Sequence, residues 1–544
     1  MESLAKLLFT TDSHDPLPIN VDTPYSPVIT ARDGKIQGRR MINEADFKAD
    51  AYLGIPFASP PVGDLRFRKP VPPKDWSGIR QCFKHPTASV QISDKVTFCK
   101  WPSSEDCLYL NVFCPGDNIG KKFPVMVFIH GGAHAFSYIK KYGDQGLCDG
   151  LVRRGVIVVT VQYRLGILGF FSTGDEVCPG NFGLWDQIEA LKWVQENIEH
   201  FGGDKNNVTL FGQCSGGVCA DLISLSPYSR GLIHRLIPMS GNANATWAHQ
   251  KSIADYCKKY AGTKLGIFAE SNDELIEKLR CVPADQLRVR VYFRNIGWRE
   301  TIRNFCPVID GDLLPHAIEE LRRTAPVLPL MAGVTTLEGG LSLRPKDVHE
   351  DSIRQAIDAM LPKGARRETR DSLVTLYKDV GVRRQPEHAV WRARVELSSD
   401  RMYNIPTVKL LTECSGKGAP TYLYVFSYYN PKCIGREAHF APCSEASHSC
   451  DLAYVFNAGV DEHFEFSEDD KQMAETMTRA FINFTKRGNP NDVGSSTWLP
   501  CDAEHPGRHM VLDLNPRVED DFNEGRCEKW LELFKQEHYL KSSL

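Results

Sequence analysis

The sequence predicts an α/β fold in which a mainly parallel β-sheet is covered by helices on both faces, with further helices inserted as a cap. Three observations predict it. Near-continuous apolar runs, typical of strands buried on both faces, occupy residues 123–130 and 155–163. Helical patterns alternate with such runs, and this alternation favours a parallel sheet. A glycine-bracketed turn at residues 212–216 joins a β-rich run to a segment that could begin a helix.

The composition is that of a globular chain. Its 544 residues are 42 % hydrophobic and 24 % charged, and the net charge of −3 gives no reason to expect nucleic-acid binding. No run of about 20 apolar residues is present, so we expect no membrane span. The N-terminus has no secretory layout, and the 17 cysteines show no zinc-site spacing. We therefore expect reduced thiols and a cytoplasmic protein. The sequence specifies no oligomeric state.

The first elements are loops and strands. Residues 1–22 are polar and rich in Pro and Asp, and we expect a mobile lead-in there. Residues 28–38 predict a hairpin that turns at Asp33-Gly34. The proline-punctuated stretch 51–67 is poor for a helix. The apolar run at 123–130 then ends in His-Gly-Gly-Ala-His at 130–134.

Helices and strands alternate through the rest of the chain. Residues 235–241, 329–335 and 422–427 predict later strands of the same sheet, and the charged, helix-like residues 345–400 predict a cap over the site. No linker divides the chain, so we expect one domain over residues 23–535 and a C-terminal tail over 536–544. The helix expected between the glycines at 180 and 203 carries apolar residues at spacings of three and four: Leu184, Ile188, Leu191, Val194 and Ile198.

The turn at residues 212–216 has the layout of a nucleophile elbow, which lifts one side chain above an α/β sheet. Such a turn needs glycine two residues before and two residues after the nucleophile, because the backbones crowd there. Gly212 and Gly216 bracket Cys214, so the candidate nucleophile is a thiol. Ser215 cannot take this place, because Gln213 would then stand where the first glycine must be.

Around this elbow, a series of motifs resembles the type-B carboxylesterase and cholinesterase family of α/β hydrolases. The resemblance extends over nearly the whole chain and implies an α/β-hydrolase fold. The motifs, in the family's order, are Gly-Ile-Pro-Phe-Ala-Ser-Pro-Pro-Val-Gly at 54–63, Ser-Glu-Asp-Cys-Leu-Tyr-Leu-Asn at 104–111, Tyr-Arg-Leu-Gly at 163–166, Gly-Asn-Phe-Gly-Leu-Trp-Asp-Gln at 180–187, Phe-Gly-Gly-Asp at 201–204 and Asn-Phe-Thr-Lys-Arg-Gly-Asn-Pro-Asn at 483–491.

The resemblance implies a catalytic triad of Cys214, Glu338 and His448. Glu338 lies in a segment similar to the family's Asp-Glu-Gly, and His448 lies in Ser-His-Ser-Cys-Asp at 447–451. The order nucleophile, acid, base is that of α/β hydrolases. His448 would take the proton of the nucleophile, and Glu338 would orient the imidazole and stabilise its cation.

The resemblance also implies the groups around the triad. The backbone N–H groups of Gly132, Ala133 and Ser215 would bind the charge that develops on a substrate carbonyl. The family usually has a third glycine where Ala133 stands, and the alanine methyl narrows the site. The remaining matches are the residues next to the triad, Gln213, Ser240 and Trp247, and a structural ion pair of Arg66 with Glu105.

Several departures from the family bear on function. The family's Gly-Glu-Ser-Ala-Gly is here Gly-Gln-Cys-Ser-Gly. Ser89 stands where the usual disulfide partner of Cys107 would be, which agrees with a reducing compartment. Trp101 has a different spacing from the family's choline-site tryptophan, so we do not expect choline esters as substrates.

Cys214 has three interpretations. As a working nucleophile, a thiol at a helix N-terminus beside histidine can have a pKa well below about 8.5, and Gln213 in place of glutamate removes a charge that disfavours the thiolate. Alternatively, a pocket shaped for oxygen misplaces the larger sulfur, and the chain is a catalytically inactive binder of ligands or proteins, as neuroligin-like relatives are. Thirdly, Cys214 and the nearby Cys219 sense redox conditions.

We expect the first interpretation: hydrolysis of a small-molecule carboxylic ester through a thioester on Cys214. The reaction requires no cofactor. We expect no metal either, because His130 and His134 flank glycines and have no evident third ligand.

Overall fold

The computed structural model of the chain describes residues 25–91, 101–116, 120–289, 305–341, 343, 345–361, 365–434, 442–460 and 463–536. The lead-in expected at residues 1–22 lies outside this part of the chain. So does the tail expected at 536–544, apart from its first residue.

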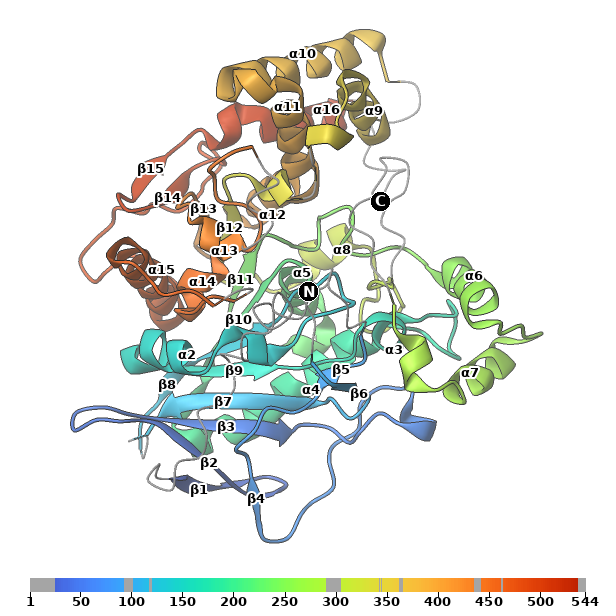
Figure 1. Cartoon of the computed structure of the whole chain (residues 1–544), viewed down its shortest axis with the longest axis vertical. Coiled ribbons are helices and arrows are strands. Elements are labelled where there is room, and N and C mark those ends of the chain that lie inside the picture. Colours follow the sequence, from blue (N-terminus) through green and yellow to red (C-terminus); the bar gives the residue numbers. More distant parts are fainter. Residues whose placement is uncertain are drawn as a thin grey trace, which may run out of the picture.

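Strands from nearly the whole described chain form one large sheet (Figure 1). Its order is β1-β2-β3-β7-β9-β8-β10-β11-β12-β13-β14-β15, and β4 pairs with β2. The pairings from β9 through β14 are all parallel, while the pairings nearer either edge are antiparallel apart from that of β4 with β2. The expected mainly parallel sheet is confirmed at its centre. The strands of this sheet are β1 (Tyr25–Ala31), β2 (Gly34–Asn43), β3 (Lys48–Pro56), β4 (Ile79–Gln81), β7 (Tyr109–Pro115), β8 (Phe123–Ile129), β9 (Ile157–Val161), β10 (Gly203–Gln213), β11 (Arg235–Met239), β12 (Leu330–Thr335), β13 (Thr421–Phe426), β14 (His509–Leu512) and β15 (Arg517–Glu519).

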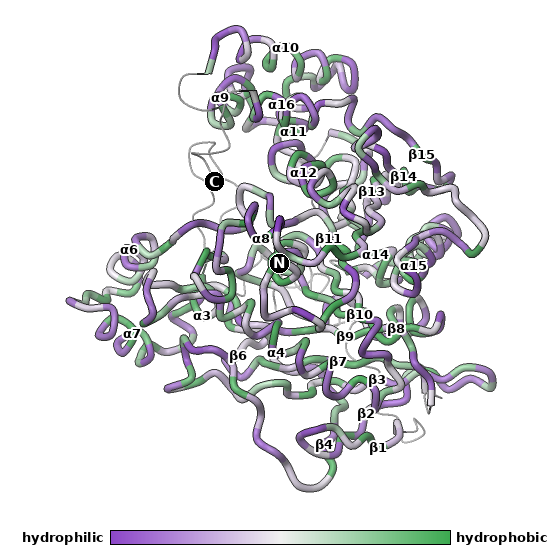
Figure 2. The backbone as a smooth tube through the Cα atoms, turned by 180° about the vertical axis from the view of Figure 1, so that it is seen from behind, coloured by the Kyte–Doolittle hydropathy of each residue, from purple (hydrophilic) through white to green (hydrophobic). Residues whose placement is uncertain are grey.

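The apolar strands serve two cores, one on each face of the sheet. In β8, Val125 and Val127 join one buried cluster, whereas Met126 and Phe128 join the other. Successive side chains of a strand point to opposite faces, so a strand between two cores must be apolar at every position. Figure 2 shows the central strands as mainly hydrophobic and the outlying helices as more hydrophilic.

Helices cover both faces. Residues of α4 and α5 belong to the larger core, and residues of α2, α14 and α15 belong to the other. The helices are α2 (Gln145–Gly150), α3 (Gly166–Phe170), α4 (Phe182–Asn197), α5 (Ser215–Leu225), α6 (Ala254–Leu265), α7 (Asn272–Arg280), α8 (Ile318–Thr324), α9 (Glu350–Met360), α10 (Arg367–Arg384), α11 (Ala389–Ser399), α12 (Ile405–Cys414), α13 (Pro431–Ile434), α14 (Leu452–Phe456), α15 (Glu468–Arg487) and α16 (Arg526–Gln536); a separate two-stranded sheet consists of β5 (Ala88–Ser89) and β6 (Ser103–Ser104).

The expected helical insertion lies between β12 and β13. It comprises α9, α10, α11 and α12, and Figure 1 shows the first three grouped with α16 at one end of the molecule. A π-helical segment, Asp400–Asn404, joins α11 to α12. Such segments are rare and often lie at functional sites. Among the described residues, no helix combines the length and apolar character needed to cross a bilayer.

Candidate active site

Cys214 stands at the junction of β10 and α5. It adopts φ 56° and ψ −125°, a conformation that non-glycine residues rarely take. Its backbone N–H donates to Met239 O at 2.8 Å, which ties the turn to β11, and Val218 N–H donates to Cys214 O at 3.0 Å as α5 begins. The thiol is half-buried. The turn therefore has the expected elbow geometry.

The glycines around the elbow are required by close backbone contacts. A Cβ atom on Gly212 would lie 2.4 Å from Gly216 O, and one on Gly216 would lie 2.1 Å from Ile129 O. A Cβ on Gly241 would lie 2.2 Å from Cys214 O. Any side chain at these positions would push the nucleophile out of place.

Glu338 and His448 lie together beside this turn. His448 Nδ1 lies 2.6 Å from Glu338 Oε2. The other carboxylate oxygen accepts hydrogen bonds from Ser240 Oγ at 2.6 Å and from Thr335 N–H at 2.8 Å. Glu338 is only 2 % exposed, so these three donors fix a buried carboxylate against the imidazole.

The other nitrogen of His448 faces the nucleophile turn. Gln213 Nε2 lies 3.1 Å from His448 Nε2 and also donates to Ser449 Oγ at 2.8 Å. Gln213 is buried, and Ser449 has a left-handed φ of 76°. The amide can donate to a neutral imidazole. When the ring is protonated, the amide would have to present its oxygen instead.

The pKa values of the nucleophile and the base shift toward an ion pair. Burial would raise the pKa of the Cys214 thiol, but the charge on His448 and the hydrogen bond to it outweigh burial and lower that pKa. Burial would lower the pKa of His448, but Cys214 and Glu338 raise it well above its ordinary value. Both directions favour a thiolate next to an imidazolium.

The glycine loop after β8 presents free donors near the elbow. Gly132, Ala133 and His134 all have positive φ, at 110°, 52° and 58°. Within the described ranges, no group accepts a hydrogen bond from the N–H of Gly132 or Ala133, and both residues are half-exposed. The backbone of Ser215, at the start of α5, helps to lower the pKa of Cys214 by hydrogen bonding to it. These are the three N–H groups expected from the sequence to bind the oxygen of a substrate carbonyl.

An aromatic group over His448 was not predicted from the sequence. The Tyr403 ring lies 4.8 Å from the His448 ring and 5.9 Å from the Trp247 ring, measured between centroids. Trp247 Nε1 donates to Met402 O at 3.0 Å, so Trp247 approaches the site through the π-helical segment. No local sequence pattern could reveal Tyr403, because its contacts span distant parts of the chain.

The residues considered for metal or redox roles are buried. Burial lowers the pKa of His130 to about 4 and that of His134 to about 3, so both are neutral. The described residues contain no group of three or more His, Cys, Asp or Glu side chains arranged to hold a metal ion. Cys219 is fully buried, and burial raises its pKa to about 12. It therefore stays a protonated thiol at neutral pH.

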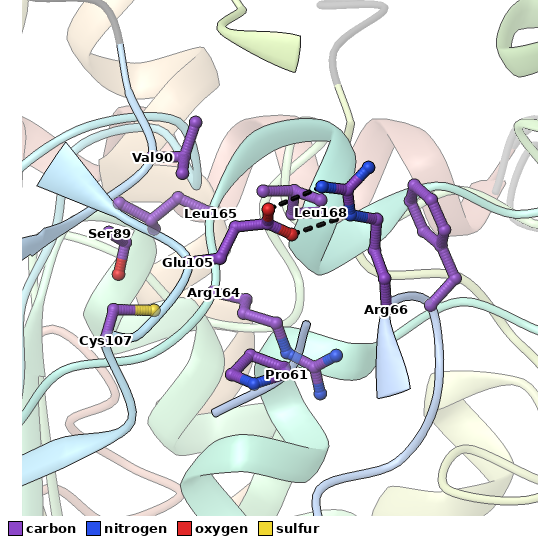
Figure 3. Close-up of a pocket in the computed structure, with 10 residues that line it drawn as sticks. Pro61, Arg66, Ser89, Val90, Glu105, Cys107, Arg164, Leu165 and Leu168 are labelled. Carbon is purple, nitrogen blue, oxygen red and sulfur yellow. Dashed lines mark hydrogen bonds and ion pairs between the residues drawn. The ribbon is translucent and has the colours of Figure 1, made fainter. Parts of the chain in front are cut away.

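A separate hollow surrounds the expected ion pair (Figure 3). Arg66 Nε and Nη2 donate to Glu105 at 2.7 and 2.5 Å, which confirms the pairing. The lining of this hollow includes none of the residues predicted for the catalytic site. Ser89 and Cys107 lie side by side in the same hollow (Figure 3), and burial raises the pKa of the Cys107 thiol to about 12. The Ser89 hydroxyl donates to Tyr163 O at 2.6 Å.

Comparison with known proteins gives one family. A model of the carboxylesterase family matches residues 25–530. The chain is 36 % identical to esterase cest-33 of Caenorhabditis elegans over 92 % of this chain and 93 % of that protein. It is 32 % identical to the cocaine esterase of Homo sapiens over 94 % and 92 % of the two chains. It is also 32 % identical to the acylcarnitine hydrolase of Mus musculus over 96 % and 94 %.

Proposed function

The chain belongs to the carboxylesterase family, and on that premise we propose that it hydrolyses small-molecule carboxylic esters through an acyl intermediate on Cys214. The names of these three relatives describe two esterases and an acylcarnitine hydrolase. The proposal requires only side chains, backbone N–H groups and water, so no cofactor or metal takes part.

The proposed cycle has two halves. The Cys214 thiolate attacks the ester carbonyl, and the N–H groups of Gly132, Ala133 and Ser215 bind the charge on the carbonyl oxygen. The bond to the alkoxy oxygen then breaks, and the His448 imidazolium gives its proton to that oxygen as the alcohol leaves. His448 then takes a proton from water, which attacks the thioester and releases the acid and the thiolate. Glu338 holds the imidazole in the required tautomer throughout.

One observation carries the proposal. The residues at positions 214, 338 and 448 meet at one elbow, with His448 held 2.6 Å from a buried carboxylate and the pKa of the thiol lowered by that histidine. An ordinary buried thiol in this chain, such as Cys219, has its pKa raised instead. Cys214 is therefore activated where the neighbouring Cys219 is not.

Hydrolysis of 4-nitrophenyl acetate by the purified protein tests the proposal. Wild type should turn over, and Cys214→Ala should fall to the background rate, a loss of roughly 100-fold or more. Cys281→Ala, which removes an exposed thiol outside the site, is the matched control and should keep full activity. A wild type no faster than Cys214→Ala would overturn the proposal.

The alternative is binding of ligand or protein without turnover. The contact of Gln213 with His448 Nε2 favours it, because this contact competes with the thiol for the base. The same assay separates the two functions. If wild type is inactive while Cys214→Ser gains activity, the site is complete except for its nucleophile, and the alternative holds.

We also infer a reducing compartment such as the cytoplasm, and a single domain over residues 23–535. All sixteen described cysteines are free, and most are buried. Strands from Tyr25 to Glu519 share one sheet, which gives the chain no evident point of division.

A further inference from the structure

The thiol nucleophile changes which bond of a substrate can break. After attack, the tetrahedral intermediate can expel either the Cys214 sulfur or the substrate's leaving group. The group whose conjugate acid has the lower pKa leaves faster. A cysteine thiol has a pKa of about 8.5 and a tyrosine phenol of about 10. Water, which resembles an alkyl alcohol, lies far higher at about 15.7.

An alkyl ester therefore needs help that a thioester does not need. Its intermediate returns to substrate by expelling the Cys214 thiolate unless an acid protonates the departing alkoxide. His448 is the group in this site that could supply the proton, and it must do so from Nε2, because Nδ1 lies 2.6 Å from Glu338. General-acid help of this kind contributes roughly 100- to 10,000-fold.

The structure places a competitor on that nitrogen. The Gln213 amide lies 3.1 Å from His448 Nε2 and is anchored by a hydrogen bond to Ser449 Oγ at 2.8 Å. Gln213 is 3 % exposed, so it has little freedom to move aside. When the ring is protonated, the amide faces it with its oxygen and accepts from Nε2–H. Delivery of the proton to a leaving group must break that hydrogen bond, which weakens the general acid where an alkoxide depends on it.

We propose that the site selects substrates by leaving group, cleaving thioesters and aryl esters while leaving alkyl esters of the same acid largely intact. This inference rests on the proposed function. In the first step, the thiolate bonds to the carbonyl carbon, the bond to the substrate's sulfur or aryl oxygen breaks, and that atom departs as an anion, which takes the His448 proton only after the bond has broken and so leaves a neutral imidazole. In the second step, water adds to the acyl group, His448 accepts its proton, and the Cys214 thiolate departs as the acid forms.

A pair of substrates that differ in one atom tests the inference. We would measure kcat/KM for S-ethyl thiobutyrate and for ethyl butyrate with wild type and with Cys214→Ser. Wild type should prefer the thioester by roughly 100-fold or more, the size of the missing general-acid contribution. In Cys214→Ser the preference should shrink, because a serine alkoxide leaves no more readily than ethoxide. Equal rates on the two substrates with wild type would overturn the inference.

Failure of the proposed function looks different. Mass spectrometry of the protein quenched after mixing with 4-nitrophenyl butyrate reports whether a butyryl group is attached to Cys214. If no acyl group appears there with any substrate, both the function and the selectivity are wrong. If the acyl group appears but the thioester and the ester react equally, only the selectivity is wrong. An acyl group together with a strong thioester preference supports both.

Discussion

Gln213 shows how one residue beside a nucleophile can set its charge state. Its amide contacts His448 Nε2 and Ser449 Oγ without bringing a charge into the site. Buried Glu338 already supplies one negative charge, and the Cys214 thiolate supplies a second against the single imidazolium. A carboxylate at position 213 would add a third, and like charges at close range disfavour ionisation.

We expect Gln213→Glu to raise the pKa of the Cys214 thiol by about 1 unit or more, which corresponds to about 1.4 kcal/mol. Only the thiolate reacts with iodoacetamide, so its alkylation rate falls about tenfold per pH unit below the thiol pKa. In wild type the pKa is lowered, so the rate falls only toward acidic pH. In the variant the whole profile moves to higher pH. Mass-resolved alkylation of Cys214 across pH measures this shift.

Gln213→Met is the matched control for this prediction. It keeps a side chain of similar length without charge, so the pH profile of alkylation should stay near that of wild type even if the rate changes. Identical profiles for Gln213→Glu and wild type would show that charge at this position has no influence on the thiol.

The candidate site could be predicted at the residue level wherever chemistry follows a local motif. The elbow glycines mark Cys214 by spacing alone, and the family resemblance supplies Glu338 and His448, which the structure brings together. Tyr403 and Ser449 could not be predicted. Their places depend on a π-helical segment and on a left-handed backbone, and neither has a local sequence pattern. Their roles follow from contacts between segments far apart in the chain.

At the scale of elements, the strand–turn–helix unit of β10 and α5 is held by backbone contacts. We expect Gly216→Ala to cost about 3 kcal/mol, because the new methyl would lie 2.1 Å from the backbone oxygen of Ile129, which cannot move aside. Ester hydrolysis should be lost along with stability. Thermal denaturation and the aryl ester assay measure the two effects.

Gly231→Ala provides the comparison for this elbow variant. Gly231 has φ 78°, but nothing lies within 4 Å of an added Cβ, so the substitution costs only backbone strain of about 1 kcal/mol. It should keep its activity. If Gly216→Ala is no less stable than Gly231→Ala, the backbones at the elbow are not as close as the structure has them.

The burial of α4 is only partly predictable from its sequence. The spacing in α4 predicts one apolar face, and those residues are buried, but the polar Gln187 and Asp186 of the same helix are buried too. Asp186 pairs with Arg164 at 2.6 Å. A helix packed between a sheet and a further layer is buried on nearly all sides, which periodicity does not reveal.

At the scale of the molecule, the parallel sheet follows from the alternation of apolar runs and helical patterns in the sequence. The contacts that attach the helical insertion between β12 and β13 to the rest of the fold do not follow from any such pattern. Arg526 of α16 pairs with Glu396 at 2.6 Å and Asp400 at 2.8 Å, and all three are fully or almost fully buried. This network ties a helix near the end of the chain to the segment that carries Tyr403. The pairing partners lie more than a hundred residues apart, so no local pattern predicts them.

The absence of disulfides among the described cysteines leads to a prediction about the whole fold. The midpoint temperature of thermal denaturation of wild type should therefore not change when reductant is added.

The variant Ser89→Cys places a second thiol beside Cys107. Oxidation would join the two in a disulfide, and closing that loop should raise the free energy of unfolding by about 3 kcal/mol. Loss of the Ser89 hydrogen bonds to Tyr163 O and from Gln162 offsets part of this gain, about 1 kcal/mol each. The oxidised variant should therefore denature at a higher temperature than the reduced one, while Ser89→Ala shows no response to reductant.

A wild type destabilised by reductant would mean that a disulfide already stabilises the fold. A Ser89→Cys variant that never oxidises would mean that the side chains at positions 89 and 107 do not face each other.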